Sequence, residues 1–546
     1  MSGFTGLVAV GLVAVPSLAT AQTTLDRVDP AKIEQRSAPP VGKPVHNVPL
    51  ATPSVVTPPP TASAPITVGA ITVIGLEKTR PSDFADIFEI YAGRTLSPAA
   101  LAGLADAIAD RLHDRGYVFA TAAILPQRLD AGLLRVTVDE GRIDAVRLQG
   151  GDNAAVRAAL APLVGTGPVK LDEVERRLLI AGDVDGLWIK RTRFVREKGR
   201  NILVLDLGRD RISGVLGLDD YGSRPIGPLE ADATVRIAQV FSSADLLTLS
   251  GVFTPAEPRE FAYGRARYSR RVSRDGTELS ASFSYSEAHP GSYLTSRDIT
   301  GKSWTGELGL LQPLVRRRVE SLWFNASFSV RTVRQDYAGE LARRDRLSVL
   351  RFGVYGFTSL WGGRLRADAT LSQGLDLFNA TRLGDPLASR PRAYARFTSV
   401  ATSVDWTGPL TGRWSAQVAV TTQIASRPLL VSEQVGLGGG RFLRGYDYSE
   451  RTGDEGVMES SELRYALPDK VGFATKPVLY GFVDGGHVIN LRGGIGGTLF
   501  SAGGGVRTGL GARMSADVGV AFPLSGPRYD SGDANPVFNF RLTRRF

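Results

Sequence analysis

The side chains and short motifs that most often carry enzyme chemistry are scarce in this sequence. The chain has 546 residues, no cysteine and four scattered histidines, His46, His113, His289 and His487. It contains no G-x-x-x-x-G-K-[ST] nucleotide loop, no H-E-x-x-H zinc motif and no G-x-S-x-G nucleophile motif. We therefore predict no catalytic residue, no metal site and no cofactor. His487 follows the stretch "FVDGG" and could be a ligand, although a lone histidine is more often structural.

One stretch combines unusual residue types, "GGGRFLRGYDYSE" at residues 438–450. It has four glycines, two arginines and three aromatic rings, and Leu443 is its only aliphatic residue. It is too polar for a buried strand, and its composition is not that of a flexible linker. The question it raises is what holds Arg444 in place, and the elements around it must supply the answer.

The overall charge allows several kinds of partner. The formal net charge is +10, with a sequence pI near 9.8. Such a balance fits a nucleic acid, anionic lipid headgroups, or simply a basic surface without a partner. There is no zinc-finger pattern, RNP-like aromatic motif or block of consecutive basic residues, so we predict no nucleic-acid partner.

The N-terminal residues predict export. An apolar run is followed by Pro16 and then by the small residues of "ATA", which is the order of a secretory signal peptide. We expect residues 1–21 to be removed, although no basic residue precedes the run and a buried N-terminal strand or helix is the alternative. Residues 22–65 are rich in proline and predict a linker, in which Leu25 to Ser37 could form a short helix. No other apolar run is long enough for a transmembrane helix.

Residues 66–142 and 143–209 predict two small α/β domains in tandem. In the first, "ITVGAITVIG" is typical of a strand, and Ser97 is placed to cap a helix that ends at Gly116. The second range repeats the order of strand, helical segments and paired strands. The buried face of the first helix is predicted to carry Leu101, Leu104, Ile108 and Leu112.

Residues 210–546 change to a period of two. In "SLWFNASFSV" the apolar positions are Leu322, Phe324, Ala326, Phe328 and Val330. Each such strand has one apolar and one wet face, which a soluble sandwich can use only if a second sheet covers it. Because the chain is predicted to be exported and no helices cover these strands, we favour a transmembrane β-barrel with a polar lumen.

The last residues, "NPVFNFRLTRRF", support a barrel. The aromatic and aliphatic side chains of one strand face are Phe538, Phe540, Leu542 and Phe546. This ending resembles the signal by which outer-membrane barrels are recognised for assembly, and it implies the barrel assembly machinery as a partner through Phe546. Arg544 falls on the same face and departs from that pattern, but a charge costs little at the headgroup level.

The stretch "RGYVFATAAILPQRLDAGLLRVTVDEGRIDAVRLQG" in the first α/β domain resembles the POTRA domain of two-partner secretion transporters. The matching residues are Gly116, Tyr117, Pro126, Gln127, Gly132, Glu140 and Gly141. The resemblance covers roughly residues 66–546. It implies two POTRA domains before a membrane barrel of about sixteen antiparallel strands, and an N-terminal plug helix, for which Leu25 to Ser37 is the only candidate.

The opening question is answered by the same resemblance. "LRGY" (Leu443, Arg444, Gly445 and Tyr446) looks like the VRG(F/Y) motif of this superfamily, with leucine in place of valine. "FVDGG" looks like the companion motif on the inner barrel wall, with Phe482, Asp484, Gly485 and Gly486 as its matching residues. The resemblance implies that Arg444 meets Asp484 inside the lumen. An ordinary extracellular loop and an unrelated aspartate are the alternative.

We therefore expect a protein-exporting barrel in the outer membrane of a Gram-negative bacterium, with its POTRA domains in the periplasm. Its partners would be membrane lipid and a large hemolysin- or adhesin-like β-helical exoprotein, which it recognises by an N-terminal secretion domain, exports without ATP and in some cases activates. We expect a monomer. A barrel assembly factor of the same superfamily is the second hypothesis, and a barrel enzyme or passive porin is the third.

Overall fold

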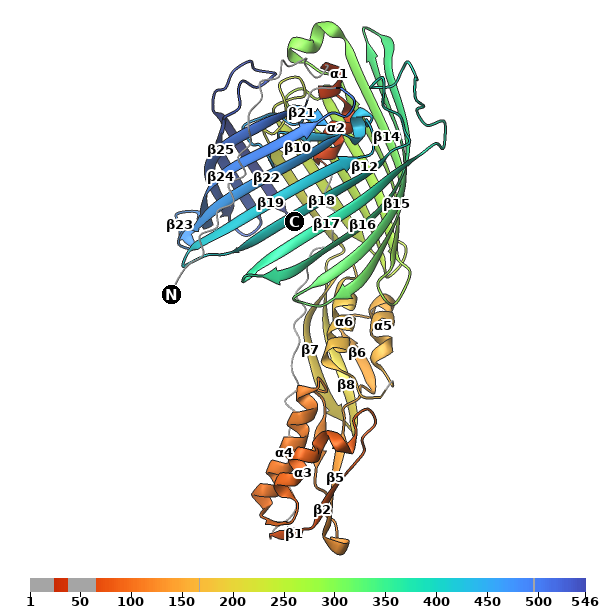
Figure 1. Ribbon diagram of the computed structural model, residues 1–546, viewed down its shortest axis with the longest axis vertical. Helices are drawn as coiled ribbons and strands as arrows, with labels where there is room; N and C mark the ends of the chain where they lie inside the picture. The colour runs from red at the N-terminus through yellow and green to blue at the C-terminus, as the bar shows by residue number, and fades with distance from the viewer. Residues whose placement is uncertain (1–23, 38–64, 166, 494–495) are drawn as a thin grey trace.

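The computed structural model describes residues 24–37, 65–165, 167–493 and 496–546. A wide barrel stands at one end of the molecule, and two small α/β domains extend from it in a line (Figure 1). The predicted leader, residues 1–21, lies outside the described residues, as does most of the segment 22–65.

The first α/β domain, farthest from the barrel, packs its helices against a small sheet of order β2-β5-β4, beside the pair β1-β3. As predicted, the Ser97 side chain caps α4 by accepting a hydrogen bond from the Ala100 amide at 3.2 Å. The elements are β1 (Ile66–Val68), β2 (Ala70–Ile74), η1 (Pro81–Phe84), α3 (Ala85–Tyr91), β3 (Arg94–Leu96), α4 (Pro98–Asp114), β4 (Thr121–Ala123), η2 (Asp130–Gly132) and β5 (Leu133–Asp139).

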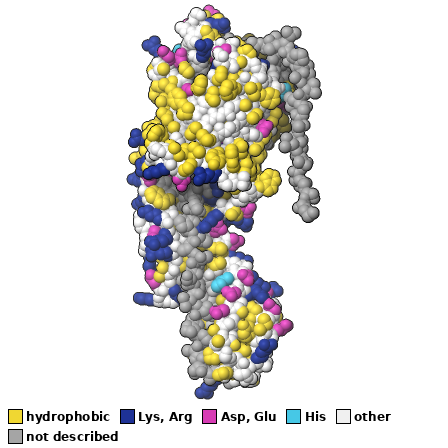
Figure 2. Space-filling model, turned by 90° about the vertical axis from the view of Figure 1, so that its left-hand side faces the viewer, with side chains coloured by type: hydrophobic (Ala, Val, Ile, Leu, Met, Phe, Trp, Pro, Cys, Tyr) yellow, Lys and Arg dark blue, Asp and Glu magenta, His cyan; other side chains and the backbone are white. Residues whose placement is uncertain are grey.

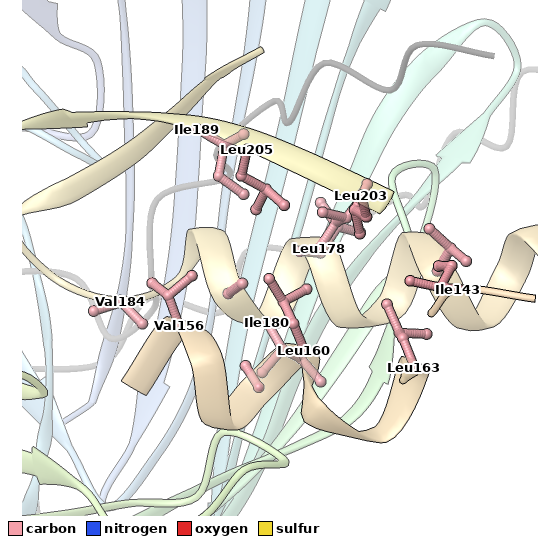
Figure 3. Packing of buried hydrophobic residues seen from close by; sticks show 14 of the residues in the cluster. Ile143, Val156, Leu160, Leu163, Leu178, Ile180, Val184, Ile189, Leu203 and Leu205 are labelled. Atoms are coloured by element: carbon pink, nitrogen blue, oxygen red, sulfur yellow. The ribbon is translucent and has the colours of Figure 1, made fainter. Parts of the chain in front are cut away.

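The second α/β domain has a sheet of order β6-β8-β7, in which β6 runs parallel to β8. The helices α5 and α6 cover one face, and Figure 3 shows Leu178 beside Leu203 of the sheet. The Asn153 side chain caps α5. The elements are β6 (Ala145–Gln149), α5 (Ala154–Leu160), η3 (Ala161–Leu163), α6 (Leu171–Gly182), β7 (Leu187–Glu197) and β8 (Arg200–Arg209).

The barrel is closed by the pairing of its last strand with its first, β27 with β9. The short β23 only extends the hairpin, because β22 also pairs directly with β24, so the predicted barrel of sixteen antiparallel strands is confirmed. Its strands are β9 (Ile212–Asp219), β10 (Glu230–Ala238), β11 (Asp245–Phe253), β12 (Phe261–Arg271), β13 (Glu278–Ala288), β14 (Ile299–Arg316), β15 (Ser321–Tyr337), β16 (Glu340–Leu360), β17 (Gly363–Leu375), β18 (Thr398–Pro409), β19 (Trp414–Ala425), β22 (Glu455–Ala466), β23 (Lys470–Val471), β24 (Ala474–Ile489), β25 (Gly497–Leu510), β26 (Met514–Pro523) and β27 (Val537–Arg545).

The two faces of the barrel strands differ in polarity as the alternation predicts. On β13, Leu279 and Phe283 are exposed on the outside, whereas Ser284 and Ser286 are buried toward the lumen. Hydrophobic side chains gather in a broad area around the barrel (Figure 2). An apolar exterior and a polar interior are what a barrel in a lipid bilayer requires.

None of the helices within the described ranges is long and apolar enough to cross a membrane.

The second α/β domain is fixed to the barrel by arginines that surround the end of α6. Arg316 makes a bidentate pair with Asp183, at 2.8 Å from Nε and 2.7 Å from Nη2, and Arg271 donates to the Ile180 carbonyl at 2.6 Å. Arg316 is only 1% exposed. Further pairs across this junction are Arg177 with Asp275, Arg318 with Glu175, and Arg236 with Asp185.

Two helices and two long loops lie within the barrel. The N-terminal helices α1 (Thr24–Arg27) and α2 (Pro30–Ser37) lie in the half of the lumen away from the α/β domains (Figure 1). The loops 376–397 and 426–454 fold inward, the second with η5 (Val431–Glu433) and the hairpin β20 (Val435–Leu437) and β21 (Arg451–Gly453). A further short helix, η4 (Ser292–Arg297), lies in the loop between β13 and β14.

Candidate functional site

The tip of the loop 426–454 is buried inside the barrel. Leu443 is fully buried in an apolar cluster with Val488 of β24 and Leu499 of β25. The Tyr446 hydroxyl accepts a hydrogen bond from the Ser525 amide at 2.9 Å and lies 3.2 Å from the Gly526 carbonyl. A loop that gives up this much conformational freedom needs fixed contacts to hold it, and these two side chains supply part of them.

Arg444 and Asp484 form the pair that the resemblance implies. The Nη2 and Nε atoms of Arg444 lie 2.8 and 3.0 Å from the two Asp484 oxygens, and the Arg444 backbone amide donates to the same carboxylate at 3.0 Å. Ser460 donates a further hydrogen bond to Asp484 at 2.7 Å. The Asp484 side chain has no solvent exposure and that of Arg444 only 9%. Such a bidentate, shielded pair fixes both the position and the orientation of the loop tip.

A second carboxylate, which the sequence did not single out, completes the site. Glu462 on β22 lies 2.8 Å from Nη1 of Arg444 and also pairs with Arg464 and Arg507, each at 2.5 Å. The guanidinium of Arg444 lies 3.5 Å from the centre of the Phe482 ring, a cation–π contact. Alternation along β22 could have placed Glu462 on the lumen face, but its proximity to Arg444 follows only from the pairing of β22 with β24.

The glycines of both motifs are needed for close packing. A side chain on Gly445 would touch the backbone at Phe522 and Pro523 at 3.0 Å. On Gly486 it would come within 2.8 Å of Leu437 and 3.1 Å of Leu443. On the opposite, outer face of the wall, a side chain on Gly485 would come within 3.0 Å of the ring of Phe500. The two motifs therefore meet with no room for a methyl group.

The three glycines that precede the loop motif have a different role from that of Gly445. Gly438 and Gly439 have φ angles of +110° and +98° and turn the loop onto its own residues Asp447 and Tyr448. Of the three, Gly440 lies against another segment, because a side chain there would come within 3.0 Å of the ring of Tyr221. These glycines shape the loop itself, and Gly445 is the one that lets it approach the wall.

The N-terminal helices are held in the lumen by polar contacts. Ser284 and Ser303 on β13 and β14 lie 2.6 and 3.5 Å from the Glu34 carboxylate, and Lys32 donates to the Gln434 carbonyl of the inward loop. Asp26 pairs with Arg343 at 2.5 Å. The helix α2 therefore contacts both the wall and the loop 426–454 and occupies part of the lumen.

Four of the seven POTRA signature residues lie at the junction of the two α/β domains. The Gly116 carbonyl accepts from the amide of Leu171 in the second domain at 2.9 Å, and Tyr117 is buried beside it. Gly141 has a φ of +83°, and a side chain there would strike Phe119 at 2.5 Å. The Gly141 carbonyl also accepts a bond from the second domain. This part of the signature therefore joins the domains.

Glu140 is the fourth of these residues and is buried. Its carboxylate accepts hydrogen bonds from the amides of Glu77, Lys78 and Thr79 at 3.0, 2.7 and 2.8 Å, and from the Thr79 hydroxyl. Burial disfavours its charged form, but these hydrogen bonds outweigh burial and hold the pKa of Glu140 below its usual value.

The remaining signature residues lie in the connection between β4 and β5. Pro126 is exposed, and the Gln127 amide group makes two hydrogen bonds with the Arg135 backbone, at 2.9 and 2.7 Å. Gly132 has a φ of +73°, and its carbonyl accepts from the Gly69 amide at 2.7 Å. The seven signature residues therefore form two groups, one near the junction of the two domains and one in the connection between β4 and β5.

The C-terminal residues complete the closing strand pair. The Phe546 backbone exchanges hydrogen bonds with Gly214 at 3.0 and 3.1 Å. Asn539 reaches into the lumen and donates to the Arg444 carbonyl at 3.3 Å, so the even-numbered positions of β27 face outward. These positions include Phe538, Phe540 and Leu542.

No group of side chains suited to holding a metal ion occurs within the described ranges.

The barrel, its lumen loop and the preceding POTRA-like domains define a class of proteins, the outer-membrane transporters of two-partner secretion.

Comparison with known families agrees with that class. Residues 201–508 match the family described as haemolysin secretion/activation protein ShlB/FhaC/HecB, and residues 66–141 match the POTRA domain, ShlB-type. The first match covers more than half of the chain, and the chain belongs to this family. It is an outer-membrane transporter whose family acts with a secreted partner protein, and its α/β domains are periplasmic POTRA domains, here called POTRA 1 and POTRA 2.

Individual relatives are distant but match over most of their length. The outer membrane transporter CdiB of Dickeya dadantii is 25% identical over 456 residues, 79% of this chain and 78% of that protein. The heme/hemopexin transporter protein HuxB of Haemophilus influenzae is 22% identical over 406 residues, 71% and 69% of the two chains.

Solved structures show the same fold. CdiB from Escherichia coli has a TM-score of 0.72 at 21% identity, covering 94% of this chain and 95% of that one. BamA from Haemophilus ducreyi, lacking POTRA domains 1–3, has a TM-score of 0.54 at 15% identity, covering 88% and 100%.

Proposed function

We propose that this protein exports one large β-helical exoprotein, of the hemolysin or adhesin type, through its own lumen. The exoprotein crosses unfolded from the periplasm, and its folding outside the cell drives transport without ATP. The observation that carries this proposal is the loop tip at Arg444, which is held in the lumen by Asp484 and Glu462. The haemolysin secretion/activation family supports activation of the cargo as a further possible outcome.

Recognition of the cargo is assigned to the POTRA domains. An exported protein's N-terminal secretion domain can add a strand at an exposed sheet edge, which gains backbone hydrogen bonds at little steric cost. In POTRA 2, the sheet order β6-β8-β7 leaves β6 and β7 as the outer strands. We also assign α1 and α2 as the plug of the resting pore, because they occupy the lumen.

The sequence-based division of the chain supports this assignment of roles. In this division the chain consists of a leader (1–21), a linker (22–65), POTRA 1 (66–142), POTRA 2 (143–209) and the barrel (210–546). The transporter would act as a monomer without enzymatic activity, and Phe546 would present the barrel to the assembly machinery.

The test is a secretion assay. The chain is expressed with the large exported protein encoded beside its gene, and the medium and cell surface are assayed for that protein. Appearance of the cargo outside only when this chain is present supports the proposal. The alternative is a barrel assembly factor, because BamA shares the fold of this chain. That alternative predicts that other barrels fail to assemble when the chain is depleted.

A further inference from the structure

The side chain of Arg27, at the end of α1, lies in a pocket made by extracellular loops. Its Nη2 atom is 3.3 Å from the Glu450 carboxylate and 3.0 Å from the Asp530 carboxylate. The side chains of Arg27 and Asp530 are 5% and 1% exposed. Glu450 belongs to the loop that carries Arg444, whereas Asp530 belongs to the loop 524–536, so one cation joins the N-terminal helices to two loops.

The pocket is built for a planar guanidinium. Nη1 of Arg27 donates to the Glu450 carbonyl at 3.2 Å, and the guanidinium lies 4.3 Å from the centre of the Tyr529 ring. The Tyr293 hydroxyl donates to Asp530 at 2.7 Å, and the Tyr529 amide donates to Glu450 at 2.6 Å. These bonds fix both carboxylates. An ammonium group is a compact charge without a planar face, so it cannot stack on the ring and bond both carboxylates in the fixed directions that a guanidinium fork provides.

The contacts of Arg27 are weaker than those of Arg444. Every side-chain nitrogen of Arg444 donates a hydrogen bond, at 2.8 to 3.0 Å. Within the described part of the chain, Nε of Arg27 and one oxygen of Asp530 have no hydrogen-bond partner. Both arginines are buried, but Arg27 has fewer of its hydrogen bonds satisfied than Arg444. The contact of Arg27 with the loops is therefore the one that can open first.

We propose that this pocket is a guanidinium-binding latch, in which Arg27 holds the plug closed against the two loops and which a competing guanidinium can open. The proposal rests on the plug role assigned above. Release of Arg27 leaves Glu450 and Asp530 facing each other without the cation that bridges them, and Asp447, whose charge also acts on Arg27, adds to the repulsion. Buried carboxylates without a cation destabilise their surroundings. Departure of the plug therefore loosens the loops at the extracellular exit, while Arg444 still anchors the loop tip.

The experiment measures channel opening of the full chain in planar lipid bilayers. Deletion of residues 24–37, Arg27→Ala and the double variant Glu450→Gln/Asp530→Asn should all raise the fraction of time that the channel is open. Arg27→Lys should lie between Arg27→Ala and the wild type. Methylguanidinium added on the extracellular side should open the wild type, whereas methylammonium at equal concentration and ionic strength should not. Asp533→Asn is the matched control, because Asp533 is a carboxylate in the same loop as Asp530 but pairs with Arg528 at 2.9 Å.

The outcomes separate the latch from the plug. If the deletion opens the channel but Arg27→Ala and methylguanidinium do not, the latch is wrong and the plug role stands. If the deletion leaves the channel closed, the plug role itself fails. Heat-modifiable mobility in electrophoresis shows which variants form a folded barrel, and the effect of methylguanidinium on the wild type tests the latch even if a variant does not assemble.

Discussion

Arg444 and Asp484 connect a movable loop to a rigid wall, so a change at either should affect transport before it affects the barrel. Arg444→Ala leaves Asp484 buried without its cation, which costs about 3–5 kcal/mol. Asp484→Ala leaves Arg444 with Glu462 as its partner but without the bidentate bonds that orient the loop tip. In both variants the loss falls on the loop. The barrel itself is held by the hydrogen bonds of sixteen strands. We expect secretion to be lost, measured as cargo in the medium, while the amount of chain in the outer membrane stays unchanged.

The reversed pair, Arg444→Asp with Asp484→Arg, is the companion to these single changes. Partial recovery of secretion in the reversed pair would show that the contact between the two charges matters. Normal secretion by both single variants would mean that the pairing has no role in transport.

Glu462 should be as important to the loop as Asp484. Glu462→Gln keeps the shape of the side chain but removes the charge shared by Arg444, Arg464 and Arg507, whose positive charges then repel one another. We expect residues 438–450 to become more accessible to protease added outside the cell. Glu459→Gln is the control, because Glu459 lies on the same strand but is exposed. Equal cleavage of both variants would contradict the role of Glu462.

At the scale of elements, the local pattern of the sequence determined most of the fold. The step of three and four in α4 and the alternation in strands such as β15 were visible because each is repeated within one element. The position of Glu462 beside Arg444, and that of α1 and α2 within the lumen, depend on contacts between distant segments. Alternation shows which face a side chain takes but not which neighbour it meets, and only the family resemblance joined Arg444 to Asp484.

The end of α6 should be the main attachment of POTRA 2 to the barrel. Arg316→Ala leaves Asp183 buried without its bidentate partner, which costs about 3–5 kcal/mol at this junction. Because the chain has no cysteine, spin labels can be attached at one introduced site in POTRA 2 and one in the barrel. We expect a narrow distance distribution in the wild type and a broad one in Arg316→Ala. Arg317→Ala is the control, because the Arg317 side chain pairs with Glu320 in its own turn. A broad wild-type distribution would refute the attachment.

The Glu140 contact predicts a pH dependence within POTRA 1. Its pKa is lowered from the ordinary value of 4.5, so the unfolded state binds the proton more tightly. The stabilisation is therefore fully present above pH 4.5 and is lost as the pH falls below 4.5 through the lowered pKa. Hydrogen exchange of the amides at residues 77–79, corrected for its intrinsic pH dependence, should show this loss in the wild type. Glu140→Gln should show no such change, and an equal change in both would exclude Glu140 as its source.

At the scale of the whole molecule, the same part of the barrel contacts both POTRA 2 and the helix α2 in the lumen. The helix α6 of POTRA 2 packs against β14, and α2 packs against β13 and β14 within the lumen. The arginines that hold α6 lie at the periplasmic ends of these strands and their neighbours. Farther along the same strands, within the lumen, Ser284 of β13 and Ser303 of β14 bind the Glu34 carboxylate of α2. We therefore expect a movement of POTRA 2 to act most directly on the strands that contact α2.

The strand pair that closes the barrel distinguishes transport through the lumen from barrel assembly. The ladder between β27 and β9 has five residue pairs, fewer than the eight between β26 and β27. An assembly factor would have to open this pair to offer a strand edge to a client, whereas a polypeptide that crosses the lumen needs no such opening. Leu218 and Leu542 are direct partners across it, and opposed residues in antiparallel strands are close enough for a disulfide.

We therefore expect the oxidised Leu218→Cys/Leu542→Cys variant to secrete as much cargo as the reduced variant, measured in the same assay with and without reductant. The control is Leu249→Cys/Ala266→Cys, which links direct partners on β11 and β12 away from the closure. A loss of secretion on oxidation that is specific to the 218–542 link would show that the closure must open. That outcome would favour the assembly mechanism over passage through the lumen, because the link leaves the lumen itself and the pair of Arg444 with Asp484 unchanged.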